Sequence, residues 1–251
     1  MAHNRVALIT GAGRGIGLAA TKLFLQNGYR VVASDIDLSP ARKELAEGGA
    51  GKKVEFVEGD VTKEKDVEGM AQTALSKFGQ LDASLINAGV LSPIVPWLDS
   101  PQDSVDKMLT VNVKGAWLTA KHSVRAMLDS PNKGRGSSMV FVSSVSSLYG
   151  EPGMSAYCAS KWAVRGLSLT ASQEFAPYGI RTNCIQPGAT DTDMFNGFPD
   201  ELREAIKKTV PLKRTASPLE IAQVMLFLSD PDKAGYMNGS SVAVHGGQAP
   251  T

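Results

Sequence analysis

Short, mainly apolar runs recur along the 251-residue chain, and longer stretches with apolar residues at helical spacing separate them. Continuous apolar runs of this length are typical of strands buried on both faces, as in a parallel sheet. Parallel strands joined by helices need right-handed crossovers, which place helices on both faces of one sheet. The alternation therefore predicts an α/β fold with a doubly wound parallel sheet. The predicted strands cover residues 6–9, 31–33, 54–57, 83–86, 139–142 and 182–185, the predicted helices cover 16–26, 64–77, 111–127, 156–176 and 219–228, and a last strand at 241–244 closes the sheet edge.

A single domain over residues 1–251 is expected, because 43% hydrophobic residues can build one large core and no repeat or linker divides the chain. Two irregular segments interrupt the pattern. Residues 129–138 are polar and are typical of a surface loop without an assigned function. Residues 188–214 carry Met and Phe among acids and prolines, after a strand whose carboxyl end faces the ligand crevice. We predict that this second segment is a lid.

The charge balance argues against several classes of partner. The 26 basic and 25 acidic residues leave a formal charge of +1, which offers no footprint for nucleic acid or an anionic membrane. No apolar run reaches the roughly 18 residues that span a bilayer, and the start of the chain shows no signal-peptide pattern. The only cysteines, Cys158 and Cys184, are too few for a disulfide framework. We expect a cytoplasmic protein whose partner is a small molecule.

A glycine-rich turn follows the first predicted strand and opens the first predicted helix, where residues 10–17 read TGAGRGIG. Glycines let the backbone approach a pyrophosphate, and the free N–H groups and dipole of a helix N-terminus stabilise its charge. The spacing departs from G-x-G-x-x-G and fits T-G-x-x-x-G-x-G. A tight strand-to-helix connection would also explain the glycines. The preferred interpretation is a dinucleotide site in a Rossmann-like sheet, formed by Thr10, Gly11, Arg14, Gly15, Ile16 and Gly17.

Asp35 ends the second predicted strand, where a carboxylate can accept hydrogen bonds from both adenosine ribose hydroxyls. The same carboxylate would repel the 2′-phosphate of NADP. Arg14 opposes this prediction, because a guanidinium in the glycine turn could pair with that phosphate. We expect Asp35 to dominate, which predicts NAD as the cofactor and leaves NADP as the alternative.

Tyr157 and Lys161 stand at i and i+4 on a predicted helix, so their side chains share one face. A nearby ammonium and a cationic nicotinamide ring would stabilise the phenolate of a tyrosine, which could then take the proton of an alcohol as hydride leaves. Ser144 ends a predicted strand shortly before this helix, and its hydroxyl could polarise the substrate oxygen. Residue chemistry alone does not separate it from its neighbours Ser143 and Ser146.

Together these motifs resemble the compact branch of the short-chain dehydrogenase/reductase family over residues 6–247. The family's T-G-x-x-x-G-x-G falls on residues 10–17, and its Tyr-x-x-x-Lys falls on Tyr157 and Lys161. Its Asn-Ala-Gly after the fourth strand falls on Asn87, Ala88 and Gly89, which the resemblance assigns to cofactor binding.

The resemblance also implies roles for residues that the local pattern leaves open. The interval before Tyr157 selects Ser144 as the catalytic serine, and the family's helix asparagine falls on Asn112, where it would hold a water beside Lys161. The resemblance further implies a homotetramer and transfer from the B face of nicotinamide. It assigns adenine contacts to Asp60 and Val61, and contacts to the nicotinamide carboxamide to Pro187, Gly188, Thr190 and Thr192.

The three histidines do not form a metal site in the sequence. His3 is terminal, His122 lies alone on a predicted helix, and His245 stands where family members often have Asp, before Gly246-Gly247. No cluster of His, Cys and acidic residues has the pattern of a catalytic zinc site. We expect a mechanism without a metal, and a structural role for His245.

The expected function is therefore an NAD(H)-dependent oxidoreductase of secondary alcohols or ketones. An NADPH-dependent 3-oxoacyl or polyketide-type ketoreductase is the enzymatic alternative, which Asp35 argues against. A non-enzymatic NAD-binding module is the alternative from another class, and the intact proton-transfer residues argue against it. The expected pocket has an apolar cap of Leu91, Pro96, Trp97, Tyr149, Met154, Met194 and Phe195.

Overall fold

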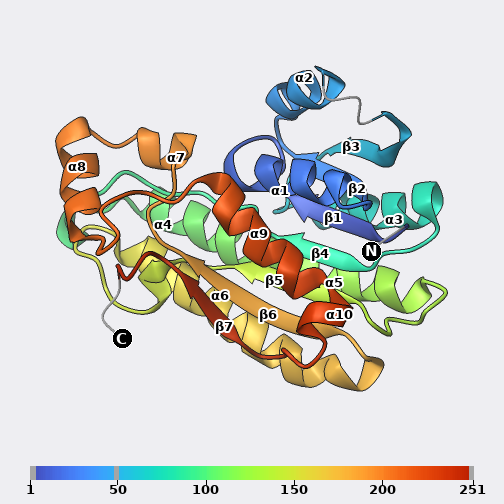
Figure 1. The fold of residues 1–251 in the computed structure, drawn as a ribbon. Coiled ribbons are helices and arrows are strands. Elements are labelled where there is room, and N and C mark those ends of the chain that lie inside the picture. Colours follow the sequence, from blue (N-terminus) through green and yellow to red (C-terminus); the bar gives the residue numbers. More distant parts are fainter. Residues whose placement is uncertain (1–3, 48–50, 249–251) are drawn as a thin grey trace.

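The computed structural model describes residues 4–47 and 51–248. All seven strands lie in one parallel sheet with the order β3-β2-β1-β4-β5-β6-β7 (Figure 1). The predicted Rossmann-like doubly wound sheet is confirmed, including β7 at its edge. The strands are β1 (Val6–Thr10), β2 (Arg30–Asp35), β3 (Val54–Glu58), β4 (Ala83–Ile86), β5 (Ser138–Val142), β6 (Arg181–Pro187) and β7 (Ser241–Val244).

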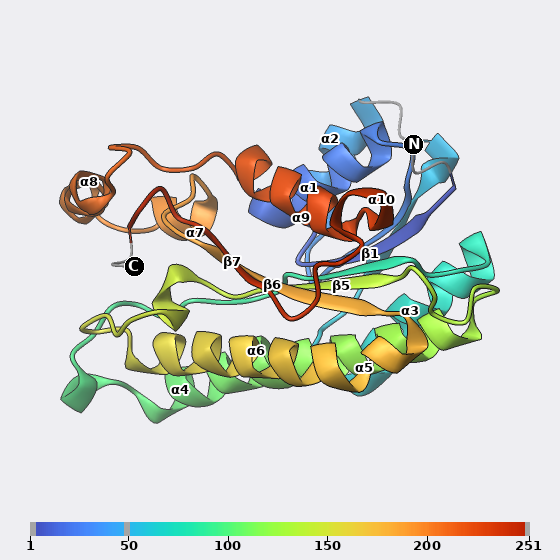
Figure 2. The same ribbon diagram turned by 60° about the horizontal axis from the view of Figure 1, so that its bottom comes forward.

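Two layers of helices cover the sheet (Figure 2). One face carries α1 (Gly15–Gln26), α2 (Ser39–Glu47), α9 (Pro218–Ser229) and α10 (Pro231–Ala234). The other face carries α3 (Glu64–Phe78), α4 (Gln102–Met108), α5 (Gly115–Asp129) and α6 (Ser155–Glu174). Two further helices, α7 (Asp193–Asn196) and α8 (Asp200–Thr209), follow β6 beyond the carboxyl end of the sheet. Short 3₁₀ turns lie at Gly51–Lys53, Trp97–Asp99, Val145–Ser147 and Ala176–Tyr178.

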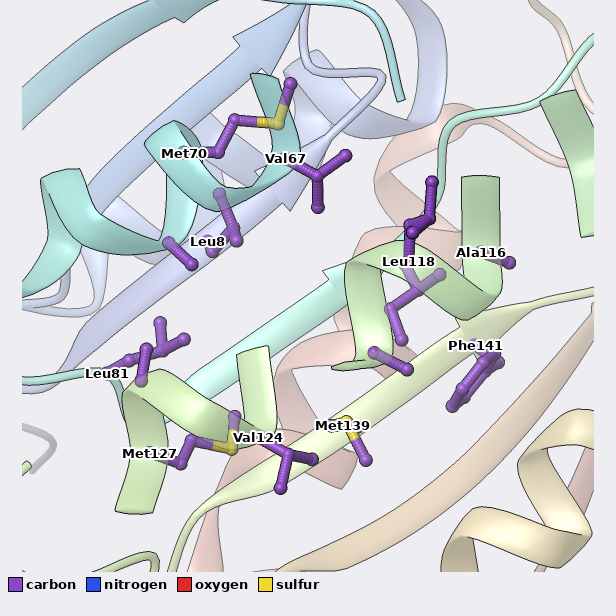
Figure 3. Close-up of a cluster of buried hydrophobic side chains, with 14 of the residues drawn as sticks. Leu8, Val67, Met70, Leu81, Ala116, Leu118, Val124, Met127, Met139 and Phe141 are labelled. Carbon is purple, nitrogen blue, oxygen red and sulfur yellow. The ribbon is translucent and has the colours of Figure 1, made fainter. Parts of the chain in front are cut away.

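Buried apolar side chains fill the space between the sheet and each helical layer. Figure 3 shows the cluster under α3 and α5, where Val67, Met70 and Leu118 from the helices meet Leu8 and Phe141 from the strands. Each fully buried side chain of this size stabilises the fold by about 1.5–3 kcal/mol. The second cluster packs α1 and α9 against the other face of the same strands. The continuous apolar strand runs thus reflect burial on both faces.

The strand order reverses between β1 and β4, which lie side by side with Ile9 opposite Leu85. Connections from the carboxyl ends of these strands leave toward opposite faces, because α1 and the helices after β4 cover different faces. Such a switch point creates a crevice where α/β proteins bind ligands. The fold therefore directs attention to the turns after β1, β4, β5 and β6.

Several helices differ from the sequence prediction. The predicted helix 111–127 is a π-helix, Leu109–Lys114, followed by α5. The helices α2, α4, α7, α8 and α10 were not predicted, because they are short or, like α8, contain no fully buried residue. Residues 130–137 form turns between α5 and β5, as predicted for a surface loop. None of the described helices is long and apolar enough to cross a membrane.

Candidate active site

Tyr157 and Lys161 lie on the inward face of α6, with only 9% and 5% of their surfaces exposed. The Lys161 Nζ atom donates a hydrogen bond of 3.1 Å to the carbonyl of Val142, the last residue of β5. The same atom lies 5.6 Å from the centre of the Tyr157 ring. The i, i+4 spacing on α6 thus brings both groups together at the carboxyl end of β5.

Burial shifts both titrating groups toward their neutral forms. It raises the pKa of Tyr157 to about 12, an effect that a hydrogen bond with Ser144 opposes and the charge of Glu151 reinforces. Burial lowers the pKa of Lys161 to about 8. Tyr157 is consequently a neutral phenol near neutral pH, and Lys161 loses its proton more readily than an ordinary lysine.

Residue chemistry alone did not separate Ser143, Ser144 and Ser146 as candidates for the catalytic serine. Their contacts in the structure do distinguish them. The Ser143 hydroxyl donates to the Lys161 carbonyl at 2.7 Å and so ties β5 to α6. The Ser146 hydroxyl donates to the carboxylate of Glu151. Ser144 is the serine whose side chain acts on Tyr157, since it opposes the rise of the Tyr157 pKa that burial causes. It also donates to Ser146 at 3.2 Å.

Asn112 lies buried within the π-helix, and its amide is fully engaged with neighbouring elements. Its Oδ1 atom accepts from the Val90 N–H at 2.8 Å, and its Nδ2 donates to the Val90 carbonyl and the Ser160 hydroxyl, each at 3.0 Å. These bonds join the loop after β4 to α6. A Cβ atom on Gly89 would lie 3.3 Å from Asn112 Oδ1 and 3.4 Å from Lys161 Nζ, so any larger residue there would crowd the site.

The glycine turn after β1 is packed so closely that side chains do not fit. A Cβ on Gly17 would lie 2.0 Å from the carbonyl oxygen of Gly11, whose own φ of +67° favours glycine. Gly15 likewise has a positive φ, and Ile16 packs beside the apolar cluster under α1. The residue before α1, Arg14, makes no side-chain cap, so the first N–H groups of this helix have no side-chain acceptor there.

Asp35 and Arg14 have different surroundings at the rim of this turn. The Asp35 carboxylate accepts a hydrogen bond of 2.8 Å from the Gly13 N–H, which fixes it beside the turn. The Arg14 guanidinium is directed toward two other acids, at 2.9 Å from Asp37 and 3.7 Å from Asp193. Asp35 thus faces the glycine turn, and Arg14 is engaged in surface ion pairs.

Asn87 and Thr10 hold the turns after β4 and β1 together. The Asn87 amide donates to the carbonyls of Thr10 and Gly11 at 2.9 and 3.1 Å. The Thr10 hydroxyl accepts from the N–H groups of Asn87 and Ala88 at 3.2 and 3.3 Å. Thr10 is only 1% exposed, so its side chain supports the crevice from beneath.

The turn after β3 contains Asp60 and Val61. The Asp60 carboxylate accepts from the Thr62 N–H and hydroxyl at 2.9 and 2.8 Å, and these bonds lower its pKa. Val61 packs against Gly115 at the start of α5, where a Cβ would come within 2.7 Å of it. Both residues follow the carboxyl end of β3, and their contact with adenine stays a prediction.

The segment after β6 runs beside the glycine turn. Pro187 ends β6, and the Thr190 hydroxyl donates to the Gly188 carbonyl at 2.9 Å. Thr192 caps α7 by accepting from the Phe195 N–H at 3.5 Å. A Cβ on Gly15 would lie 3.2 Å from the Thr192 methyl group, which brings α7 and the glycine turn side by side.

This combination of a glycine turn with a buried Tyr and Lys matches known proteins along almost the whole chain. A family model described as enoyl-(acyl carrier protein) reductase matches residues 11–249. The chain belongs to the short-chain dehydrogenase/reductase family. It is therefore an oxidoreductase that acts on CH–OH or ketone groups with a nicotinamide cofactor.

Individual members of the family show how broad this similarity is. A 3-oxoacyl-(acyl-carrier-protein) reductase of Thermotoga maritima is 37% identical over 98% of both chains. A cis-4-hydroxycyclohexanecarboxylate dehydrogenase of Sinomonas cyclohexanicum is 32% identical over 97% of this chain and 96% of its own. The crystal structure of a 3-ketoacyl-(acyl-carrier-protein) reductase of Brucella melitensis complexed with NADH has a TM-score of 0.90 and 29% identity, with 99% of both chains covered.

The two described histidines of this short-chain dehydrogenase/reductase, His122 and His245, have hydrogen-bond partners other than Tyr157 and Lys161. His122 is buried on α5 with its Nε2 atom 3.1 Å from Glu64, so it has a partner that the sequence did not suggest. The Nδ1 atom of His245 accepts from the Gly247 N–H at 3.1 Å. His3 lies outside the described residues. No group of three or more His, Cys, Asp or Glu residues in the described ranges is arranged to hold a metal ion.

Only some residues of the expected apolar cap are buried or pack near Tyr157. Leu91 and Met154 pack in the same apolar cluster as Tyr157. Phe195 is buried on α7, but Trp97 is 78% exposed in a 3₁₀ turn. Glu151, which the sequence analysis missed, accepts hydrogen bonds from Ser146 and, at 3.4 Å, from Tyr149. Its position between the motif residues Ser144 and Tyr157 is the signal that would have identified it.

Proposed function

We propose that this short-chain dehydrogenase/reductase is NAD(H)-dependent and interconverts a secondary alcohol and a ketone, with Tyr157 as the proton donor and acceptor and without a metal. The observation that carries the proposal is the burial of Tyr157 and Lys161 in one pocket beside Ser144. The pKa values of Tyr157 and Lys161 are both strongly shifted. Neighbouring groups with such shifts are candidates for acid–base chemistry.

The turn after β1 fits a dinucleotide pyrophosphate. Its glycines leave no room for side chains, and the uncapped N-terminus of α1 presents N–H groups to an anion. A nicotinamide bound there would supply the hydride for reduction and would accept it in oxidation. We assign the cofactor contacts to the turns after β1, β3, β4 and β6, with Tyr157 and Lys161 bordering the nicotinamide end.

The charged residues at the carboxyl end of β2 favour NAD over NADP. The Asp35 carboxylate lies at the glycine turn, held by the Gly13 N–H, where it would accept from ribose hydroxyls and repel a 2′-phosphate. Arg14 would have to leave Asp37 and Asp193 to neutralise that phosphate. Both observations disfavour NADP.

The proton chemistry follows from the neutral state of Tyr157. In reduction its phenol gives a proton to the developing alkoxide, and in oxidation the phenolate takes the alcohol proton. Ser144 binds the substrate oxygen beside Tyr157. The Lys161 ammonium offsets the cost of the buried phenolate.

The side-chain amide of Asn112 supports the site by holding neighbouring segments in place. Because Oδ1 and Nδ2 are committed to Val90 and Ser160, a water held beside Lys161 would use the backbone carbonyl of Asn112. This refines the role that the family resemblance suggests. The asparagine side chain maintains the π-helix and the loop after β4.

Other functions have weaker support. An NADPH-linked 3-oxoacyl or polyketide-type ketoreductase agrees with the similarity to acyl-carrier-protein reductases, but Asp35 disfavours its cofactor. The Brucella protein of that name was crystallised with NADH, so similarity to it does not favour NADPH. A non-enzymatic NAD-binding module would have no need to keep Ser144, Tyr157 and Lys161 together.

We further propose that the enzyme is a homotetramer of the cytoplasm. Trp117 on α5 and Trp162 on α6 are exposed, and Trp117 lines an apolar hollow of about 420 Å³ together with Ala163 and Leu167 of α6. Phe227 on α9 and Tyr236, which follows α10, are also exposed. Two such faces can support two types of contact between copies. The two free, buried cysteines agree with a reducing compartment.

Substitution of Tyr157 by Phe tests the proposal. We expect the variant to bind NADH as the wild type does and to lose ketone reduction by roughly 100-fold or more, because only the proton donor is removed. NADH binding is measured by nicotinamide fluorescence and turnover by NADH absorbance. Retained turnover in Tyr157→Phe would refute the assigned role.

A further inference from the structure

Glu151 is a carboxylate that the proton chemistry above does not use. It lies in the loop between Ser144 and α6, and its two oxygens accept from Ser146 and Tyr149. The Ser144 hydroxyl donates to Ser146 at 3.2 Å, so a chain of only two hydrogen bonds joins Ser144 to this carboxylate. Glu151 is therefore two hydrogen bonds away from Ser144, the residue that the proposed function places on the substrate oxygen.

No Lys, Arg or His side chain in the described parts of the chain lies within ion-pair distance of Glu151. Its negative charge acts on Tyr149 and Tyr157, whose pKa values burial raises and this charge raises further. Glu151 is partly buried, and its hydrogen-bond donors are the hydroxyls of Ser146 and Tyr149, so its charge faces the Tyr157 side of the site without an ionic partner.

A carboxylate has about four acceptor positions on its two oxygens. The hydroxyls of Ser146 and Tyr149 occupy two of them, which leaves acceptor capacity for a ligand. The remaining capacity suits only a hydrogen-bond donor. An anionic group on the substrate would instead be repelled by the unpaired charge.

Resting on the proposed function, we propose that Glu151 is the specificity-determining residue of this enzyme and selects a ketone or alcohol that carries a hydroxyl or ammonium group on the carbon beside the reacting carbon. Ser144 and Tyr157 hold the reacting oxygen, and Glu151 accepts from the neighbouring donor. Ser146 links the two interactions, because its hydroxyl contacts both Ser144 and Glu151. Unsubstituted ketones and ketones with a neighbouring carboxylate are poor substrates.

Matched ketones test this assignment. Acetoin and butanone differ by one hydroxyl beside the carbonyl, 2-hydroxycyclohexanone and cyclohexanone repeat that comparison in a ring, and 3-aminobutan-2-one supplies the ammonium donor. With NADH, we expect wild-type kcat/KM to favour the hydroxylated member by about tenfold or more, the effect of one hydrogen bond to a charged acceptor. In Glu151→Ala the preference should fall to about twofold or less, because the acceptor is lost.

Glu151→Gln distinguishes the two donors. The amide keeps an acceptor oxygen without charge, so the preference for a hydroxyl should largely remain while the preference for an ammonium is lost. Glu174→Ala removes an exposed carboxylate at the far end of α6, is the matched control and should leave every preference unchanged.

Several results would overturn the inference. It fails if wild type reduces both members of each pair equally, if it reduces neither member, or if Glu151→Ala keeps the full preference. NADH titration and the Tyr157→Phe variant report on the proposed function separately. Tight NADH binding with Tyr157-dependent reduction of butanone, and no effect of Glu151, would leave the proposed function intact and remove this inference alone.

Discussion

At the scale of single residues, Lys161 shows the conflict between function and stability. Its ammonium is buried, and its only hydrogen bond in the described structure goes to the Val142 carbonyl. Burial lowers the pKa of this lysine from 10.5 to about 8. The folded protein therefore holds a charge at neutral pH that the unfolded chain carries more easily in water.

We expect Lys161→Met to abolish turnover and to raise the free energy of unfolding of the cofactor-free protein by roughly 1–3 kcal/mol at pH 7. The sign follows from linkage. Below pH 8 the wild type pays the full cost of the buried charge, and between pH 8 and 10.5 the folded lysine is neutral while the unfolded one still binds a proton. The advantage of Met should therefore shrink as the pH rises from 7 to 9.5.

Urea denaturation at several pH values measures this difference. Lys65→Met, at an exposed position on α3, is the control and should change the free energy of unfolding by less than about 0.5 kcal/mol. A destabilised Lys161→Met protein at pH 7 would show that the ammonium contributes bonds that outweigh its desolvation.

At the scale of elements, the segment from β6 to α9 has the features of a closing lid. Its base is held by the Asp191 N–H, which donates to the Ala216 carbonyl at 2.8 Å, and its far end by the Leu212 N–H, which donates to the Gly246 carbonyl at 3.3 Å. Between them α8 contains no fully buried residue. Few buried contacts imply a low free energy of local opening.

We expect trypsin to cleave the native protein first in α8, at Arg203, Lys207 or Lys208, because this helix opens without global unfolding. NADH should slow that cleavage severalfold, since α7 lies over the glycine turn that the cofactor would occupy. Mass spectrometry of the first fragments identifies the site. First cleavage elsewhere, or no protection by NADH, would contradict a lid that closes on the cofactor.

At the scale of the whole molecule, the proposed homotetramer rests on the exposed apolar residues of α5, α6 and α9. Isolated exposed apolar residues are common on monomers, but Leu109, Trp117, Trp162 and Leu169 all lie on the π-helix, α5 and α6. A contact that uses the same face of two copies would bury these residues reciprocally about a two-fold axis. A second such contact through α9 would complete a tetramer.

We expect light scattering of the wild type to give four chain masses. Trp117→Glu should reduce this to two or one, because burying the new charge at the contact costs several kcal/mol. Lys65→Glu, on exposed α3, is the control and should leave the mass unchanged. A monomeric wild type, or a tetrameric Trp117→Glu protein, would contradict the assembly.

The regular part of the fold follows directly from the sequence pattern, whereas its departures depend on tertiary contacts. Strands such as β4 were predicted within a residue or two, because burial on both faces demands continuous apolar runs. The π-helix was not predicted, since its formation is associated with the bonds of Asn112 to Val90 and Ser160, which no local pattern encodes. The helix α8 was missed because its apolar residues are few and only partly buried.

Some features of the candidate site could likewise be predicted from the sequence, and others depend on tertiary contacts. The spacing of Tyr157 and Lys161 predicted a shared helix face, and both side chains are buried next to each other. Helical spacing could not predict the burial that moves their pKa values. It also could not separate Ser143 from Ser144 or identify Glu151, because those roles depend on which side chain the loop after β5 directs toward α6.

The most direct test of the central claim is fluorescence titration of the purified protein with NADH and with NADPH. Because Asp35 faces the glycine turn and Arg14 is paired with Asp37 and Asp193, we expect NADH to bind at least about tenfold more tightly, a difference near 1.4 kcal/mol. In Asp35→Ala this preference should largely disappear. Tighter binding of NADPH by the wild type would contradict the NAD assignment and favour a biosynthetic ketoreductase.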